Sequence, residues 1–194
     1  MMLQLKCLLV FFGIHSFVSA QETTLLPTGK PVKSMYMVSR LSTMPGSSWQ
    51  AGGGLVYGWG LLHSAGYQFN KVLGAGAGAG FELYGSGMPI SFPVFAEIRT
   101  YLGKPKKVSP FAVWAGGWGF VNNGSNNGDE GEDVWKGGWM GKFQIGLLFG
   151  NHFTVHSGLS VQAMKRQWTN VWNQGFGTDN LLMQRLEFGV GLSW

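Results

Sequence analysis

Apolar side chains recur at every second position through much of this chain, and this constrains its fold more than any other feature. In the last segment, one parity holds Leu182, Leu186, Phe188, Val190, Leu192 and Trp194. The other parity holds Met183, Arg185, Glu187, Gly189, Gly191 and Ser193. Successive side chains of a β-strand point to opposite faces, so this spacing predicts a strand with one apolar face and one small or charged face.

The same alternation recurs in residues 73–83, 92–102, 139–149 and 153–163. In each of these segments, large apolar residues share one face, and glycine, polar or charged residues share the other. After Ala20 the chain has no run of about 18 consecutive apolar residues, which a transmembrane helix would need. We therefore expect an all-β protein.

The composition excludes two other classes of protein. Charged residues make up only 12% of the 194 residues, about half the share in a typical soluble domain. Aromatic residues reach 14%, which argues against a disordered chain, since such chains are rich in charge and poor in aromatics. A coiled coil is excluded as well, because it needs far more Ala, Glu, Lys and Leu.

Residues 1–20 have the features of a secretory signal peptide. A short basic region ends at Lys6, an apolar run from Cys7 to Ile14 follows, and Val18-Ser19-Ala20 suits cleavage after Ala20. Cys7 is the only cysteine, so we expect no disulfide, cysteine-based metal site or cysteine nucleophile in the mature chain. Residues 21–33 are expected to form an N-terminal extension, and residues 34–194 a β-barrel domain.

The spacing of the strands predicts an eight-stranded antiparallel up-and-down transmembrane β-barrel. The expected strands are 34–44, 54–69, 71–85, 90–102, 108–120, 137–150, 152–165 and 182–194. Three links are short and contain Gly, Asn or Pro, as tight hairpins require, whereas the links 45–53, 121–136 and 166–181 are long and polar. Short turns at one end and long loops at the other are typical of outer-membrane barrels, with the short turns and both termini on the periplasmic side.

A membrane location explains the composition. A sheet in lipid must close on itself, and its outer face must be apolar. Aromatic residues such as Tyr67, Phe153, Trp118 and Trp139 stand near the proposed strand ends, where interfacial side chains are preferred. The lumen of an eight-stranded barrel is narrow and filled by side chains. Five charged residues would point inward and must pair there: Glu97, Arg99, Lys142, Arg185 and Glu187.

Several motifs resemble small outer-membrane barrels of Bacteroidetes-type bacteria, within the broad OmpA/OmpX-like group. They are Gly66-Tyr67-Gln68-Phe69-Asn70, residues 73–78, residues 92–99, Lys107-Val108-Ser109-Pro110-Phe111 and the C-terminal run 186–194 with its aromatic last residue. The resemblance covers roughly residues 54–194. It implies a bacterial outer-membrane location and insertion through the C-terminal strand by the barrel insertion machinery, and it implies no common catalytic residues. The chain departs from the pattern at Trp114 and Trp118, where smaller or more polar residues are expected. We therefore assign no facing to strand 108–120, and the weaker alternation in strands 34–44 and 54–69 leaves their facing unassigned as well.

Histidine and serine are adjacent at His63-Ser64 and at His156-Ser157, which raises the question of a hydrolase. Neighbouring strand residues point to opposite faces, so neither pair can act as nucleophile and base, although a histidine could reach a serine on a neighbouring strand. His152 and His156 share a face but lie roughly 13 Å apart along a strand, too far for one metal ion. We expect no catalytic, cofactor-binding or metal-binding residues.

Three further features have simple structural interpretations. The glycine alternation at residues 74–80 lacks the spacing of a phosphate-binding loop and is better read as a strand with a small-residue face. The acidic loop 122–133 offers oxygen ligands for calcium but does not fit an EF-hand, so a solvated outer loop is the simpler interpretation. Lys104, Lys106 and Lys107 form a basic turn that suits anionic headgroups, and no extended basic face suggests nucleic acid.

We therefore expect a monomeric, non-enzymatic outer-membrane protein with a filled lumen and a role in envelope structure or surface interaction. Its partners would be membrane lipid and lipopolysaccharide, and it would hold no cofactor. Two alternatives stay open. One is an outer-membrane enzyme that modifies lipid A, and the other is a soluble periplasmic barrel that binds an apolar ligand. A porin-like channel is disfavoured, because eight strands leave too little width for an aqueous pore.

Overall fold

A computed structural model describes residues 34–48, 55–85, 89–102, 107–122, 133–150, 152–170 and 175–194. The expectations for residues 1–33 and for most of the loop 122–133 lie outside these residues. The described chain folds into nine strands: β1 (Ser34–Ser48), β2 (Leu55–Gln68), β3 (Leu73–Tyr84), β4 (Ile90–Tyr101), β5 (Val108–Asn122), β6 (Asp133–Lys136), β7 (Gly138–Phe149), β8 (Phe153–Asn170) and β9 (Gly175–Ser193).

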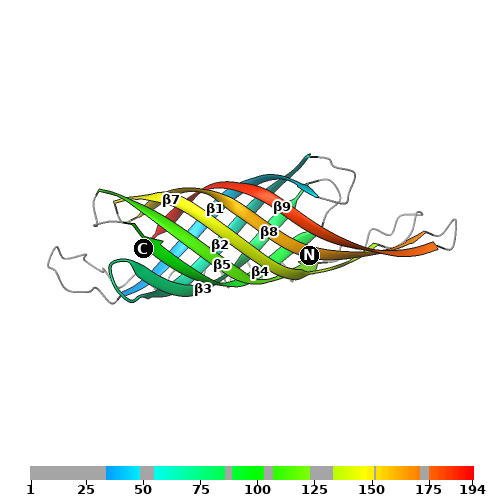
Figure 1. The fold of residues 1–194 in the computed structure, drawn as a ribbon, viewed down its shortest axis with the longest axis horizontal. Coiled ribbons are helices and arrows are strands. Elements are labelled where there is room, and N and C mark those ends of the chain that lie inside the picture. Colours follow the sequence, from blue (N-terminus) through cyan, green and yellow to red (C-terminus); the bar gives the residue numbers. More distant parts are fainter. Residues whose placement is uncertain are drawn as a thin grey trace, which may run out of the picture. The chain divides into compact units, whose positions relative to one another are not determined.

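The strands form one closed antiparallel barrel with eight positions around its wall (Figure 1). From β1 to β5 each strand pairs with the next, β5 pairs with β7, β7 with β8 and β8 with β9, and β1 pairs with β9 to close the sheet. β6 and β7 occupy a single position, because both pair with β8 and they follow one another along it. The predicted fold is therefore confirmed, because the sheet closes on itself through β1 and β9.

A β-bulge separates β6 from β7. Lys136 pairs with Lys165 and Met140 pairs with Gln162, so three residues of one strand stand opposite two residues of β8. Gly137 lies at this step, and a Cβ added to it would overlap the carbonyl oxygen of Gly119. Glycine is required here because the neighbouring backbone comes too close for any side chain.

The register of the strands defines the geometry of the barrel. Following paired residues once around the wall from Val38 on β1 leads back to β1 at Ser48, ten residues further along the strand. In an eight-stranded barrel, a stagger of this size corresponds to strands tilted by about 35–45° and to a narrow interior that side chains can fill.

Side chains alternate between lipid-facing and luminal positions as the sequence predicts. On β9, Phe188, Val190 and Leu192 are exposed, whereas Arg185 and Glu187 are buried in the lumen. The predicted faces of β3, β4, β7 and β8 are confirmed in the same way. The structure also settles the faces left unassigned: Trp114 and Trp118 point outward from β5, each 49% exposed.

Short turns and both ends of the barrel wall lie together at one end. Ser34 pairs with Gln68 beside the β2–β3 turn, where the Asn70 side chain accepts hydrogen bonds from the backbone of Val72 and Leu73, each 2.8 Å long. The chain turns after β7 at Gly150, whose φ of +60° is a backbone conformation that favours glycine. Trp194 pairs with Met37 through two backbone hydrogen bonds at the same end. The predicted arrangement of turns and termini is confirmed for these described residues.

The strands extend further at the other end than predicted. β8 continues to Asn170 and β9 begins at Gly175, so the predicted loop 166–181 is wrong, since most of it forms a long hairpin (Figure 1). β1 likewise continues to Ser48, β5 to Asn122, and β6 supplies strand within the predicted loop 121–136. These extensions carry polar residues on both faces, so they lack the apolar alternation that predicts strands within the membrane.

Candidate functional site

The lumen is the candidate site, because buried polar residues converge there from all eight wall positions. At its centre lies Glu97 on β4, which is 2% exposed. Its carboxylate contacts the Arg40 guanidinium at 2.5 Å and accepts a hydrogen bond from Ser64 at 3.0 Å and another from Tyr36 at 3.2 Å. Arg99 adds a longer contact of 3.5 Å. One buried carboxylate is thus shared by two arginines and two hydroxyl groups.

Gln144 connects this cluster to a second one around Lys142. Arg40 donates to the Gln144 side-chain oxygen at 2.8 Å, and Gln144 donates to Glu187 at 2.8 Å. The Lys142 ammonium lies between two carboxylates, 2.6 Å from Glu82 and 3.1 Å from Glu187. The charges therefore form a chain across the lumen instead of separate pairs.

The chain of contacts continues toward the hairpin end of the barrel. Tyr84 donates to both Glu82 and Gln162, the latter at 2.6 Å. Arg185 lies 3.5 Å from Glu82, and its guanidinium sits over the Tyr84 ring at 4.3 Å. Gln162 in turn donates to Ser91 at 2.8 Å. Because both carboxylate oxygens and the amide have partners here, the desolvation of these groups is largely offset.

Aromatic rings accommodate the arginines. The Arg99 guanidinium lies 5.2 Å from the Tyr36 ring and 5.5 Å from the Phe111 ring, and Arg40 lies 5.7 Å from the ring of Phe95. Such contacts stabilise a cation that has left water. The neighbouring glycines provide the room: a Cβ on Gly66 would lie 2.5 Å from the Tyr36 ring, and one on Gly78 would lie 2.5 Å from the Phe95 ring.

Apolar side chains close the lumen at two levels. Leu62, Phe95 and Met140 form one buried cluster across the interior. Nearer the hairpin end, a second cluster contains Tyr84, Met164, Leu181 and Met183. These clusters and the charge network together fill the cross-section with side chains, as the narrow barrel predicts.

All five charges predicted to face the lumen do so, and each has a partner of opposite charge: Glu97, Arg99, Lys142, Arg185 and Glu187. Sequence reasoning missed Arg40 as a luminal residue, because the facing of its strand was unassigned. It also left out Glu82, although that residue continues the parity of the inward glycines 74–80. The alternation of side chains along this strand was therefore enough to predict that Glu82 faces the lumen.

The predicted histidine–serine pairs do not form sites of their own. Ser64 and His156 are buried in the lumen, whereas His63 and Ser157 face outward, so each pair is split between the two faces as expected. His156 lies 3.7 Å from Glu187, and exposed His152 contacts the backbone oxygen of Ser193 at 3.2 Å. A histidine does meet a serine across strands: His63 Nδ1 lies 2.8 Å from Ser39 Oγ on the outer wall.

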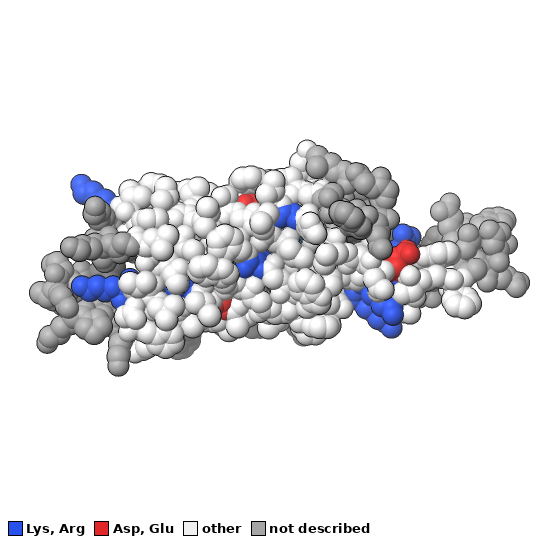
Figure 2. Space-filling view, viewed as in Figure 1, with Lys and Arg blue, Asp and Glu red and all other residues white. Residues whose placement is uncertain are grey.

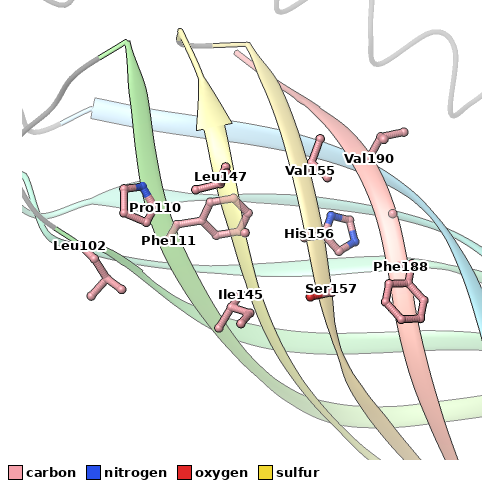
Figure 3. Close-up of a pocket in the computed structure, with 12 residues that line it drawn as sticks. Leu102, Pro110, Phe111, Ile145, Leu147, Val155, His156, Ser157, Phe188 and Val190 are labelled. Atoms are coloured by element: carbon pink, nitrogen blue, oxygen red, sulfur yellow. The ribbon is translucent and has the colours of Figure 1, made fainter.

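The outer wall is a broad apolar belt. Figure 2 shows a largely uncharged surface, with lysine and arginine side chains projecting at the two ends. Near the short turns, β5, β7, β8 and β9 form a groove of about 890 Å³ in this wall (Figure 3). Ile145, Leu147, Val155, Phe188 and Val190 are among the residues that line it. Such a lining suits hydrocarbon and offers little to a polar substrate.

Two solved structures of membrane proteins have the same architecture. The chain is similar to the outer membrane protein OprG from Pseudomonas aeruginosa, with a TM-score of 0.55 and 12% identity, over 86% of this chain and 98% of that one. It is also similar to the outer membrane protein AlkL, solved in DMPC lipid bilayers, with a TM-score of 0.52 and 12% identity, over 90% of this chain and 95% of that one. The fold is that of a small outer-membrane barrel.

Comparison by sequence adds no narrower family. No family model matches the chain, and no curated protein matches it either. The resemblance to small outer-membrane barrels thus holds at the level of the fold, while membership of the OmpA/OmpX-like or Bacteroidetes-type group stays a prediction. Among the described residues, no helix is long and apolar enough to cross a membrane, and no three His, Cys, Asp or Glu residues are grouped to hold a metal ion.

Proposed function

We propose that the chain is an integral protein of the bacterial outer membrane that acts without catalysis, in envelope structure or in contacts made by its outer end. The observation that supports this most directly is the filled lumen. Glu97, Lys142 and Glu187 are each at most 6% exposed and belong to one connected network. A solute would have to break these contacts to pass. The apolar outer wall also argues against a soluble periplasmic barrel.

Planar-bilayer recording tests the filled lumen. The refolded chain should give no stable ohmic conductance, because the apolar clusters and the charge network block the axis. A porin of known conductance, reconstituted in the same bilayer, is the positive control that shows the recording can detect an open barrel. Steady conductance from the unmodified chain would overturn the proposal.

One observation favours an enzyme instead. Ser39 and His63 place a hydroxyl 2.8 Å from an imidazole nitrogen on the wall that faces lipid, the geometry of a nucleophile and its base. The esters of membrane lipids would be the available substrates. However, the backbone N–H groups of paired strands already donate to neighbouring strands, so side chains would have to stabilise any oxyanion.

Lipid profiles separate the two functions. If the hydrogen bond between Ser39 and His63 has only a structural role, Ser39→Ala and His63→Ala should leave the lipids of the cell unchanged. Mass spectrometry of lipid A and phospholipids would then show the same profile for these variants and for the natural chain. Ser157→Ala, another outward serine on the same wall, serves as the control. Loss of a deacylated product in the first two variants alone would establish the enzyme.

A further inference from the structure

Exposed charges on the barrel have one sign. Among the residues whose side chains the structure describes, the exposed charged ones are Lys71, Lys107, Lys136 and Lys165. The carboxylates Glu82, Glu97 and Glu187 are buried in the lumen and are already paired. Asp179 is half-buried and accepts a hydrogen bond from Trp168, so the fully exposed charges among the described side chains are all positive.

Two of these lysines lie side by side. Lys136 on β6 and Lys165 on β8 are directly paired across the sheet, and both are exposed. Directly opposite residues have Cβ atoms about 4.5–5.5 Å apart, and like charges in that position are destabilising. The next residue around the wall is Asn180 on β9, which is also exposed and neutral. The described neighbours thus offer polar groups to an anion and no carboxylate to either lysine.

The pair lies where the apolar belt ends. Toward the membrane, the outward positions are Trp139, which is 52% exposed, together with Ala163 and Leu182. Toward the hairpin tip, they are Val134, Gln167 and Thr178, so polar side chains begin to replace the apolar ones there. Tryptophan marks the interface of a membrane with water, so the two ammonium groups stand at the level of the headgroups. Figure 2 shows blue basic side chains near the hairpin, with red acidic atoms between them.

The geometry points to a binding site for the phosphate of an outer-leaflet lipid, with Lys136 and Lys165 as its two ligands. This inference rests on the proposed outer-membrane location, which puts the hairpin end toward the outer leaflet, and it names the residues that would hold lipopolysaccharide. A phosphate on the lipid would screen the repulsion between the lysines, while the acyl chains would lie along the apolar belt. Asn180 would donate from its amide to a phosphate oxygen.

Binding of lipid A to the full-length, detergent-solubilised barrel tests the site. Native mass spectrometry would compare bisphosphorylated with dephosphorylated lipid A, using the natural chain, Lys136→Gln, Lys165→Gln and the double variant. An exposed lysine near a lipid surface contributes roughly a fivefold change in affinity, so the double variant should bind the phosphorylated lipid at least tenfold more weakly. Lys71→Gln and Lys107→Gln, which remove exposed lysines at the other end, should bind it normally.

Two results would overturn the site. One is equal binding of phosphorylated and dephosphorylated lipid A. The other is equal loss of binding in the double variant and in the Lys71 and Lys107 controls. Inorganic phosphate at the same concentration as the lipid should not compete, and full competition would show a site for free phosphate and refute the lipid. Membrane fractionation of cells tests the location separately, so a protein found outside the outer membrane refutes the proposed function whatever the binding result.

A charge reversal separates a structural role from a ligand role. Lys136→Glu places a carboxylate opposite Lys165 and replaces repulsion by attraction. This variant should melt at the same temperature as the natural chain or higher in detergent alone, and it should lose the rise in melting temperature that phosphorylated lipid A gives the natural chain. A variant that keeps this lipid-dependent rise would contradict the proposal.

Discussion

Glu97 holds together more of the luminal network than any neighbouring residue. Its carboxylate contacts two arginines, and replacing it by glutamine keeps the shape while removing the charge. Arg40 and Arg99 would then lie buried without their counter-charge, so Glu97→Gln should lower the free energy of unfolding by about 3 kcal/mol. Equilibrium urea unfolding of the barrel in lipid vesicles, followed by tryptophan fluorescence, measures the change.

A double variant shows whether the loss comes from the unpaired arginine. Arg40→Gln combined with Glu97→Gln removes both partners of the 2.5 Å contact. It should be less destabilised than the sum of the single variants, because Arg40 is no longer a buried charge without a partner, although Arg99 still lacks Glu97. Additive losses would mean that the two side chains do not stabilise each other.

Glycines of the wall differ in what surrounds them, and this gives a second prediction. A Cβ on Gly78 would lie 2.5 Å from the Phe95 ring, whereas a Cβ on Gly141 would have no atom within 4 Å. Gly78→Ala should therefore destabilise the barrel by about 1–3 kcal/mol through overpacking. Gly141→Ala should be neutral or stabilising by up to about 1 kcal/mol, since alanine restricts the unfolded chain. The same unfolding assay applies, and equal effects at both positions would contradict the prediction.

At the scale of elements, the outer hairpin is separable from the barrel. β9 pairs with β1 only from Met183 onward, so the residues nearer the hairpin tip take no part in closing the wall. Trp168 and Gly177 are paired in register, so a two-residue Asn-Gly turn can join them in place of residues 169–176 and leave the pairing of β6 with β8 intact. The shortened chain should fold, with an unfolding free energy within about 1 kcal/mol of the natural one.

Heat-modifiable migration on a gel and urea unfolding check this shortened chain. Trp168→Ala is the control, because it removes the indole with its 3.1 Å hydrogen bond to Asp179 and its contact with Gly177 while it keeps the hairpin at full length. A shortened chain that no longer closes into a barrel would show that the hairpin is needed for folding.

The elements also show how far the sequence predicts the structure. Within the membrane, lipid requires an apolar residue at every second position, so the faces of strands such as β4 and β9 could be assigned from Phe92–Leu102 and the C-terminal segment alone. Beyond the membrane, water accepts polar residues on both faces, and the alternation that revealed the strands is lost at Arg166–Leu181. Arg40 was missed for a related reason, since β1 mixes serine and apolar residues on its outer face.

At the scale of the whole molecule, the closed sheet sorts charge between two environments. Glu82, Glu97 and Glu187 are enclosed with arginines and a lysine, whereas exposed lysines lie at the two ends of the outer surface. This distribution could be predicted only in part. The odd or even position of a residue along its strand decides whether its side chain faces the lumen or the lipid. The partner of each charge depends instead on which strands are neighbours and on the stagger between them. That is why pairing was expected for Lys142, while its position between Glu82 and Glu187 was not.

The orientation of the barrel in the membrane follows from its two different ends. Short turns and both ends of the barrel wall lie at one end, and the long β8–β9 hairpin extends from the other, as in outer-membrane barrels whose turns face the periplasm. An epitope inserted between Asn122 and Asp133 should therefore be bound by antibody on intact cells. The same epitope at Gly150, in the turn after β7, should be bound only after the outer membrane is permeabilised. Labelling of the Gly150 insertion on intact cells would show that the barrel is inserted the other way round, and the lysine pair at the hairpin end would then face periplasmic phospholipid.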